Sequence, residues 1–127
     1  MAPAPYILVV DDDVDILGAI EAMLEDVGYA VKTTEKADYA EALPDGNGGL
    51  PNLIILDVLL SGKDGRTICR KLKSQDDTRH IPIVMISAHP DAERSVKEVG
   101  ANAFVAKPFS VDTLLDTIAG FLNSADR

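Results

Sequence analysis

The chain has 127 residues, 46% of them hydrophobic and 26% charged, which predicts one compact domain over residues 1–127 with a core of about residues 5–123. The net charge of −9 argues against direct binding to nucleic acid or to an anionic membrane, because both favour clustered Lys and Arg. The N-terminal MAPAPY lacks the features of a secretion signal, no apolar run approaches the roughly 18 residues of a membrane span, and Cys69 is the only cysteine, so we expect a cytoplasmic protein without an internal disulfide.

The first part of the chain alternates a short apolar run with a helical pattern, twice. Tyr6–Val10 is an unbroken apolar run rich in β-branched residues, which is typical of a strand buried on both faces. Over Val14–Val27 apolar residues recur at spacings of three and four, which predicts an amphipathic helix that Gly28 ends. Tyr29–Thr33 alternates as a short strand would, and a weaker helical pattern covers Lys36–Leu43.

The same alternation continues after residue 50. Two buried strands are predicted to end at polar residues, Asp57 and Ser87, and the SGKDG sequence at residues 61–65 is predicted to be a loop. A helix that begins near Pro90 is predicted to stop at Gly100. The predicted strands are Leu53–Leu56, Ile81–Ile86 and Ala103–Ala106, and the predicted helices are Arg66–Ser74, Pro90–Val99 and Val111–Leu122.

Five strands that alternate with five helices predict an α/β fold in which helices cover both faces of a parallel sheet through right-handed crossovers. In such sheets ligands bind beyond the carboxyl ends of the strands. The polar residues at those ends are Asp11, Asp12, Asp57, Ser87 and Lys107. The sequence therefore predicts a polar site along one edge of the sheet.

The residue types at this edge favour phosphoryl chemistry. Three carboxylates without His or Cys are hard oxygen ligands, which suit Mg²⁺ or Mn²⁺ rather than zinc. Lys107 adds an ammonium group and Ser87 adds a hydroxyl. A cation, an ammonium and a hydroxyl could together hold a phosphoryl group that is placed on a carboxylate as an acyl phosphate.

Four motifs in order give the chain its resemblance to a known family. They are ILVVDDD (Ile7–Asp13), LIILDVLLSGKDG (Leu53–Gly65), VMISA (Val84–Ala88) and FVAKPF (Phe104–Phe109). The chain resembles the receiver domain of two-component response regulators, of the chemotaxis-receiver type, over nearly its whole length. The resemblance implies a (βα)5 doubly wound, flavodoxin-like fold with the strand order 2-1-3-4-5.

The resemblance also implies an acceptor and a metal site. Asp57 matches the phosphoacceptor, and Asp12 matches the acidic residue that coordinates Mg²⁺ directly. Asp11 matches its partner, which usually acts through a bound water, and the backbone carbonyl of Leu59 matches a third protein ligand. The cofactor expected from this likeness is Mg²⁺, or Mn²⁺ in its place.

The remaining motif residues match the groups that respond to phosphorylation. Ser87 matches the hydroxyl that bonds a phosphoryl oxygen and shifts on phosphorylation, and Lys107 matches the lysine that pairs with the phosphoryl group. Phe104 occupies the aromatic switch position, although a core or rim aromatic is an equal alternative. The Lys107–Pro108 bond is typically cis in receivers.

The function implied is a signalling switch and not an enzyme in the ordinary sense, since a receiver catalyses only its own phosphorylation and dephosphorylation. A histidine kinase or a histidine phosphotransfer protein would donate the phosphoryl group to Asp57. The output would be a protein target or an output domain outside this chain. A phosphorylation-dependent homodimer through the fourth helix, fifth strand and fifth helix is a further possibility that receivers suggest.

Some positions depart from the family pattern. Leu60 and Ser61 stand where receivers commonly carry Met or Leu followed by Pro. Leu59 is apolar where many relatives are polar, and His89 lies two residues after Ser87, at a second position that tends to tune dephosphorylation. We therefore expect Leu59 and His89 to set the lifetime of the phosphorylated state.

Other interpretations of the acidic cluster compete with this one. Asp13 is expected to be a helix N-cap and not a ligand, and Asp64 is expected to start the third helix in the same way. A metal-dependent phosphohydrolase with Asp11 as nucleophile also fits the spacing of the acidic residues in DDDVD. That class of enzyme, however, does not need an aspartate such as Asp57 within the LDVLLSGKDG motif. A calcium loop beginning at Asp11 fails because its sixth position is Ile16 and not Gly. A receiver that no longer accepts phosphate is disfavoured because all the expected polar residues are present.

Overall fold

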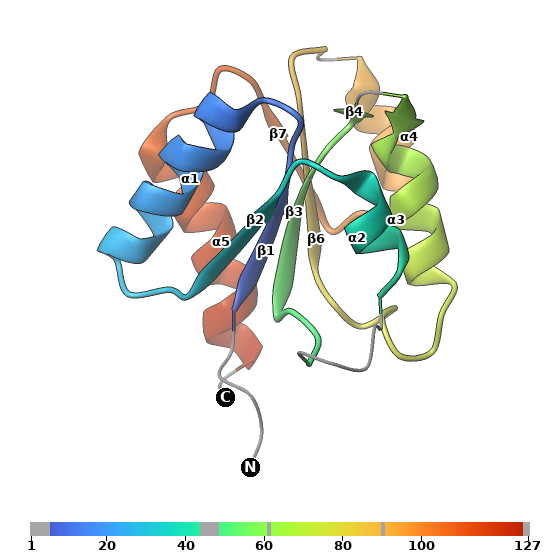
Figure 1. Cartoon of the computed structure of the whole chain (residues 1–127), viewed down its shortest axis with the longest axis horizontal. Helices are drawn as coiled ribbons and strands as arrows, with labels where there is room; N and C mark the ends of the chain where they lie inside the picture. The colour runs from blue at the N-terminus through green and yellow to red at the C-terminus, as the bar shows by residue number, and fades with distance from the viewer. Residues whose placement is uncertain (1–5, 44–48, 61, 90, 126–127) are drawn as a thin grey trace.

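The computed structural model describes residues 6–43, 49–60, 62–89 and 91–125, with the backbone alone for residues 123–125. Strands and helices alternate along the chain, and helices lie on both faces of a central sheet (Figure 1). The strands are β1 (Ile7–Val10), β2 (Val31–Thr34), β3 (Leu53–Asp57), β4 (Leu59–Leu60), β5 (Lys63–Asp64), β6 (Ile83–Ser87) and β7 (Ala103–Ala106). The helices are α1 (Val14–Asp26), α2 (Ala37–Glu41), α3 (Gly65–Lys73), α4 (Ala92–Glu98) and α5 (Val111–Ala125).

The main sheet is parallel and has five strands in the order β2-β1-β3-β6-β7. Counted within this sheet alone, the order is 2-1-3-4-5, which confirms the predicted fold class. The register pairs the last residue of each strand with a residue at or next to the end of its neighbour: Val10 with Leu56, Asp57 with Ile86, and Ser87 with Ala106. The carboxyl ends of the strands therefore form one edge, at the top of Figure 1.

Alternate residues of the central strands supply two separate cores, because successive side chains of a strand point to opposite faces. Leu8 and Val10 of β1 pack on the side of α2, α3 and α4, whereas Ile7 and Val9 pack on the side of α1 and α5 (Figure 1). All four residues of β1 are buried, which explains why the strand is an unbroken apolar run. Cys69 is buried in the first of these cores.

The predicted helix boundaries are confirmed where capping residues set them. Asp13 is the N-cap of α1, and its Oδ1 accepts from the backbone N–H groups of Asp15 and Ile16. Asp64 caps α3 in the same manner by accepting from the N–H of Arg66. Gly28 follows the C-cap of α1 with φ of 100°, a conformation that favours glycine.

The structure differs from the predictions around the polar edge. The described part of the predicted loop, residues 62–65, is not simply a loop, because Lys63 and Asp64 form β5, which pairs antiparallel with β4, and α3 begins at Gly65. β3 and β6 each extend one residue beyond the predicted ends at Leu56 and Ile86, so that Asp57 and Ser87 are the last residues of their strands. α4 begins at Ala92, and Pro90, like Ser61, lies outside the described residues.

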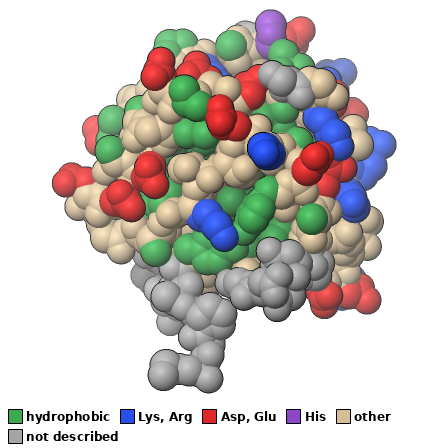
Figure 2. All heavy atoms as spheres, viewed as in Figure 1, with side chains coloured by type: hydrophobic (Ala, Val, Ile, Leu, Met, Phe, Trp, Pro, Cys, Tyr) green, Lys and Arg blue, Asp and Glu red, His purple; other side chains and the backbone are tan. Residues whose placement is uncertain are grey.

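Charge is distributed unevenly over the surface. Figure 2 shows acidic side chains gathered over α1 and basic ones over α3, where Arg70, Lys71 and Lys73 occupy the last turn. Cations in the last turn complement the negative end of the helix dipole. Among the described residues, no helix combines the length and the apolar character that crossing a membrane requires.

Candidate functional site

Polar side chains are concentrated at the carboxyl edge of the sheet. Among the described residues, the buried polar or charged side chains are Asp11, Asp57, Thr78 and Ser87, and all except Thr78 lie at this edge. Asp11 follows β1, Asp57 ends β3, and Ser87 ends the adjacent strand β6. The parallel register brings these three together, although they lie far apart in the sequence.

Lys107 joins the two buried carboxylates. Its Nζ lies 3.1 Å from Asp11 Oδ2 and 3.2 Å from Asp57 Oδ2, and only 17% of its side chain is exposed. Its backbone N–H donates to the carbonyl of Ser87 at 2.8 Å, which fixes the start of the lysine beside β6. The Lys107–Pro108 peptide bond is cis, as the motif predicted.

Backbone N–H groups orient the other oxygen of each carboxylate. Asp11 Oδ1 accepts from the N–H of Asp13 at 2.9 Å, and Asp57 Oδ1 accepts from the N–H of Leu59 at 3.3 Å. Each carboxylate is therefore held between a backbone donor and the Lys107 ammonium. This arrangement satisfies two buried charges that would otherwise be costly.

The pKa values of Asp57 and Lys107 are both raised, but for different reasons. Burial and the nearby charge of Asp11 raise the pKa of Asp57 to about 6, while Lys107 opposes this rise. Burial alone would lower the pKa of Lys107, but hydrogen bonds and charges from Asp11 and Asp57 raise it overall. At neutral pH the site therefore contains an ammonium at Lys107 and a mostly ionised carboxylate at Asp57.

Asp12 completes a group that can hold a divalent cation. One carboxylate oxygen from each of Asp11, Asp12 and Asp57 lies within 4.8 Å of the other two, and Asp12 is exposed at the surface of the group. The donor set is all oxygen, and it therefore fits Mg²⁺ or Mn²⁺.

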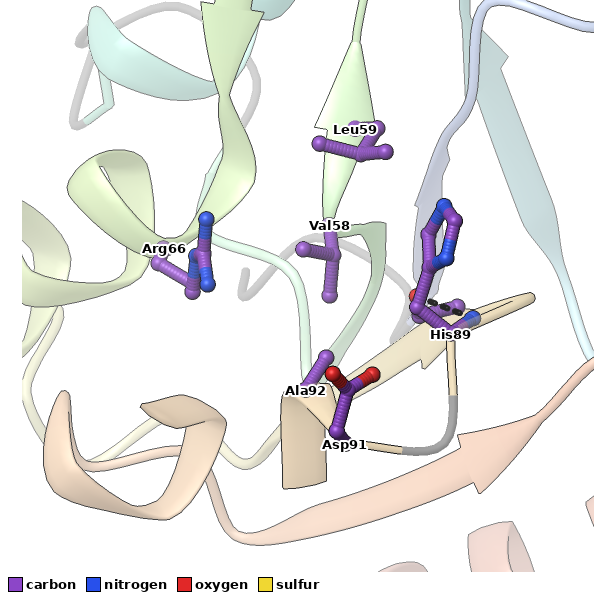
Figure 3. A pocket seen from close by; sticks show the side chains of 7 residues that line it. Val58, Leu59, Arg66, His89, Asp91 and Ala92 are labelled. Carbon is purple, nitrogen blue, oxygen red and sulfur yellow. Dashed lines mark hydrogen bonds between the residues drawn. The ribbon is translucent and has the colours of Figure 1, made fainter. Parts of the chain in front are cut away.

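A cavity of about 290 Å³ adjoins the site on the side of α4. Figure 3 shows Arg66 and His89 on opposite sides of it, with Val58 between them and Leu59 above. The Ser87 hydroxyl accepts from the N–H of His89 at 3.0 Å, the interaction drawn as a dashed line. The Ser87 side chain therefore bonds the segment that leads into α4, from the end of the strand next to the one that carries Asp57.

Two of the residues expected from the resemblance occupy more peripheral places. Phe104 is half-buried in the edge strand β7, paired with Met85, and it packs against the core on the side of α2, α3 and α4. Leu59 is 51% exposed in β4. His89 is also exposed. The structure therefore groups Asp11, Asp12, Asp57 and Lys107 directly, with Ser87 beside them and Phe104 apart.

Sequence reasoning missed the tight packing of Gly65 and the role of Arg66. A Cβ at Gly65 would lie 2.1 Å from the backbone oxygen of Asp57, and the Gly65 N–H donates to the Val58 carbonyl at 2.7 Å. Arg66 bonds Asp64 and, from Nη1, the hydroxyl of Ser95 at 2.9 Å. From the KDGR sequence only Asp64 can be recognised as a partner of Arg66, because Ser95 is 29 positions away.

Comparisons with a family model, with curated proteins and with solved structures all indicate the same family. The sequence model of the response regulator receiver domain matches residues 7–119. A probable transcriptional regulator, ycf27, of Cyanophora paradoxa is 38% identical over 123 residues, which cover 95% of this chain and 49% of that protein. The chain spans about half the length, or less, of the curated relatives it matches.

Solved structures agree with this. The receiver domain of a signal transduction histidine kinase from Syntrophus aciditrophicus has a TM-score of 0.87 and 30% identity, covering 98% of this chain and 94% of that one. The receiver domain of a sensor histidine kinase from Pseudomonas aeruginosa, solved with a magnesium ion coordinated in its active site cleft, has a TM-score of 0.83 and 26% identity, covering 96% and 99%.

Proposed function

The chain belongs to the response regulator receiver domain family, and from this premise we propose that Asp57 is its phosphoacceptor. Receiver domains are signalling modules that work as phosphorylation-dependent switches. The observation that carries the assignment is the position of Asp57: it ends a buried central strand and shares the Lys107 ammonium with Asp11. We infer that residues 1–127 act as one such domain.

In the proposed reaction, a carboxylate oxygen of Asp57 attacks the phosphorus of a phosphohistidine on the donor. The new O–P bond forms as the P–N bond breaks, and the electron pair stays on the imidazole nitrogen of the donor. With its pKa near 6, Asp57 is mostly ionised at neutral pH and able to attack. Lys107 stabilises the negative charge of the transferred group from its place 3.2 Å from Asp57.

Asp11, Asp12 and Asp57, together with the backbone carbonyl of Leu59, would hold Mg²⁺ at this edge. When bound, the cation would offset charge on the phosphoryl oxygens. The geometry that supports this is the set of three carboxylate oxygens within 4.8 Å. The magnesium ion in the Pseudomonas aeruginosa receiver supports it by likeness.

Ser87 is the residue we assign to sensing the phosphoryl group. Its hydroxyl now accepts from the His89 N–H, and donation to a phosphoryl oxygen would require it to turn toward Asp57. Phe104, on the edge strand, would then change its rotamer with Ser87 as part of the switch. Both roles rest on the motif match and on the burial of Ser87 beside Asp57.

The proposed partners follow from this chemistry. The donor is a histidine kinase or a histidine phosphotransfer protein, and the recipient of the signal is a protein target or an output domain. We place the protein in the cytoplasm, where such kinases present their phosphohistidine. A homodimer through α4, β7 and α5 that forms on phosphorylation is a further part of the proposal.

Intact-mass measurement after incubation with acetyl phosphate and Mg²⁺ tests the acceptor. We expect a gain of one phosphoryl group in the wild type that needs Mg²⁺ and is lost in Asp57→Asn. Equal labelling of both proteins would reject Asp57. Labelling lost in Asp11→Asn but kept in Asp57→Asn would favour the phosphohydrolase, in which Asp11 is the nucleophile; the complete burial of Asp11 argues against that alternative.

We further propose that Leu59 and His89 set the lifetime of the phosphorylated state, because both line the cavity beside Ser87. Leu59→Asn and His89→Glu should each change the dephosphorylation rate after the donor is removed, measured by the decay of the phosphorylated mass. Val27→Asn is a matched control at a similarly exposed apolar residue, and His80→Glu is a matched control at an exposed histidine. Lifetimes that stay equal to the wild type in both test variants would reject the assignment.

A further inference from the structure

Arg66 connects three elements through one guanidinium group. Its Nε lies 2.9 Å from Asp64 Oδ1, its Nη2 lies 2.6 Å from Asp64 Oδ2, and its Nη1 donates to Ser95 Oγ at 2.9 Å. Asp64 ends the β4–β5 hairpin, Arg66 lies in the first turn of α3, and Ser95 lies in α4. The planar fork of arginine can make both connections at once, which a lysine cannot do.

The arginine is also joined closely to the backbone of the acceptor. Arg66 follows Gly65, whose backbone is packed against the carbonyl oxygen of Asp57 and donates to Val58. The backbone of Arg66 is held by Asp64, the cap of the same helix. A short and tightly packed path therefore runs from Asp57 through Gly65 and Arg66 to Ser95.

A second path reaches the same turn of α4 from Ser87. The His89 N–H donates to Ser87 Oγ at 3.0 Å, and the His89 carbonyl accepts from the N–H of Ala92 at 3.0 Å. The Ser95 hydroxyl donates to the Ala92 carbonyl at 2.9 Å, so the two paths meet within the first turn of α4. The cavity of about 290 Å³ lies between them, lined by Arg66 on one side and His89 on the other (Figure 3).

α4 has seven residues, and a helix of this length depends on its tertiary contacts for its position. If Ser87 turns toward Asp57, its bond to the His89 N–H is lost and the start of α4 loses an anchor. The cavity offers space for that movement. The Arg66–Ser95 hydrogen bond, which does not involve Ser87, would then remain to hold α4, together with the buried side chains of Ala92 and Val96.

We propose that Arg66 is a positioning residue. Its hydrogen bond to Ser95, called the latch below, holds α4 to the segment that follows Asp57 and so limits how far α4 moves when Ser87 turns. The direction of the effect rests on the proposed function, since the movement of Ser87 begins with phosphorylation of Asp57. The latch itself is a property of the unphosphorylated domain. Losing it should shift the domain toward the state in which α4 is released.

Hydrogen–deuterium exchange of the backbone N–H groups of residues 92–99, without a phosphodonor, tests the latch. Arg66→Ala and Ser95→Ala should each speed this exchange by roughly fivefold, about the effect of losing one partly exposed hydrogen bond to a charged donor. Both substitutions remove the Arg66–Ser95 bond, and Ser95→Ala also removes the bond from the Ser95 hydroxyl to the Ala92 carbonyl. The double variant should therefore be no faster than Ser95→Ala alone. Arg66→Lys keeps the charge, and we expect it to resemble Arg66→Ala.

Matched controls exist on the neighbouring helix. Arg70→Ala removes an exposed arginine from α3, and Ser74→Ala removes a serine hydroxyl that, like that of Ser95, donates to the carbonyl three residues earlier. Neither should change exchange in residues 92–99. Exchange at the wild-type rate in Arg66→Ala, or effects that add fully in the double variant, would overturn the latch.

Acetyl phosphate with Mg²⁺ provides the second arm. In the wild type, labelling should speed exchange in residues 92–99 only modestly, because the Arg66–Ser95 bond still holds α4. In the latch variants the further increase should be at least twofold larger, because labelling then removes the remaining anchor at Ser87. An equal increase in all variants would show that the latch is not coupled to Asp57 and would overturn that part of the inference. A wild type that is never labelled would instead reject the proposed function, while the first arm still decides whether the latch exists.

Discussion

The two sides of the sheet are built differently. On one side lie α1 and α5, with 13 and 15 residues, packed through apolar side chains such as Ile20 and Ile118. On the other side lie α2, α3 and α4, with 5, 9 and 7 residues, and here polar side chains add links between elements. Long helices keep their shape with apolar packing alone, whereas short ones rely on such links. We therefore expect the first side to serve as a scaffold and the second to be the side that moves.

The largest effect that tests this comparison comes from removing the same core side chain on each side. Ile118 in α5 and Ile68 in α3 are both almost fully buried, at 0% and 1% exposure. Each substitution by Ala should lower the free energy of unfolding by about 2–4 kcal/mol, because it removes buried methyl groups and leaves a cavity. Urea denaturation measures both values.

The two variants should differ in which helices and strands lose protection from hydrogen exchange. Ile118→Ala should speed hydrogen exchange across the whole sheet, while Ile68→Ala should first speed exchange in α3 and α4, ahead of the sheet. Exchange that rises uniformly in both variants would mean that the two sides are equally cooperative, and the contrast between scaffold and mobile side would be wrong.

The acidic site lies between the two sides and gives the next largest effect. Without divalent cations, the folded state binds the proton of Asp57 more tightly than the unfolded state, because its pKa is raised to about 6 from 3.8. The free energy of unfolding should therefore fall as pH rises from about 4 to about 6 and level off above that range. Asp57→Asn lacks this ionisation and should be more stable by about 1–3 kcal/mol at pH 7.

Urea denaturation in EDTA at several values of pH tests this expectation. The advantage of Asp57→Asn should vanish below about pH 4, where the wild-type carboxyl is neutral in both states. Mg²⁺ should stabilise the wild type at pH 7 more than the variant, since the variant loses one carboxylate of the proposed metal site. A wild type at least as stable as Asp57→Asn at pH 7 in EDTA would show that Lys107 fully offsets the burial of Asp57.

The smallest effect compares two equivalent caps. Asp13 caps α1 on the scaffold side and Asp64 caps α3 on the other, each accepting from backbone N–H groups. Asp13→Ala and Asp64→Ala should each cost about 1 kcal/mol of unfolding free energy, measured by thermal denaturation. Only Asp64→Ala should also speed exchange in α4, because it frees Arg66. Asn at either position keeps the cap and should have a smaller effect.

The sequence predicted the sheet well because its strands are buried on both faces and therefore appear as apolar runs. It also predicted that Asp11, Asp57 and Lys107 would meet, since parallel strands end at one edge. It did not predict the β4–β5 hairpin, because two-residue strands leave no periodic pattern. The Arg66–Ser95 contact was equally hidden, as it depends on how α3 and α4 pack and not on local spacing.

Gly65 is constrained by packing, although it contributes no side chain to the chemistry of the acidic site. Any larger residue would bring its Cβ to 2.1 Å from the backbone oxygen of Asp57, and so would force apart the strand that carries the acceptor and the helix that follows it. In a saturation mutagenesis library screened for acceptor activity, position 65 should tolerate no substitution, including Ala. Any redesign of the surroundings of Asp57 must therefore keep Gly65, which sets how closely the helix approaches the strand, and must introduce new side chains elsewhere.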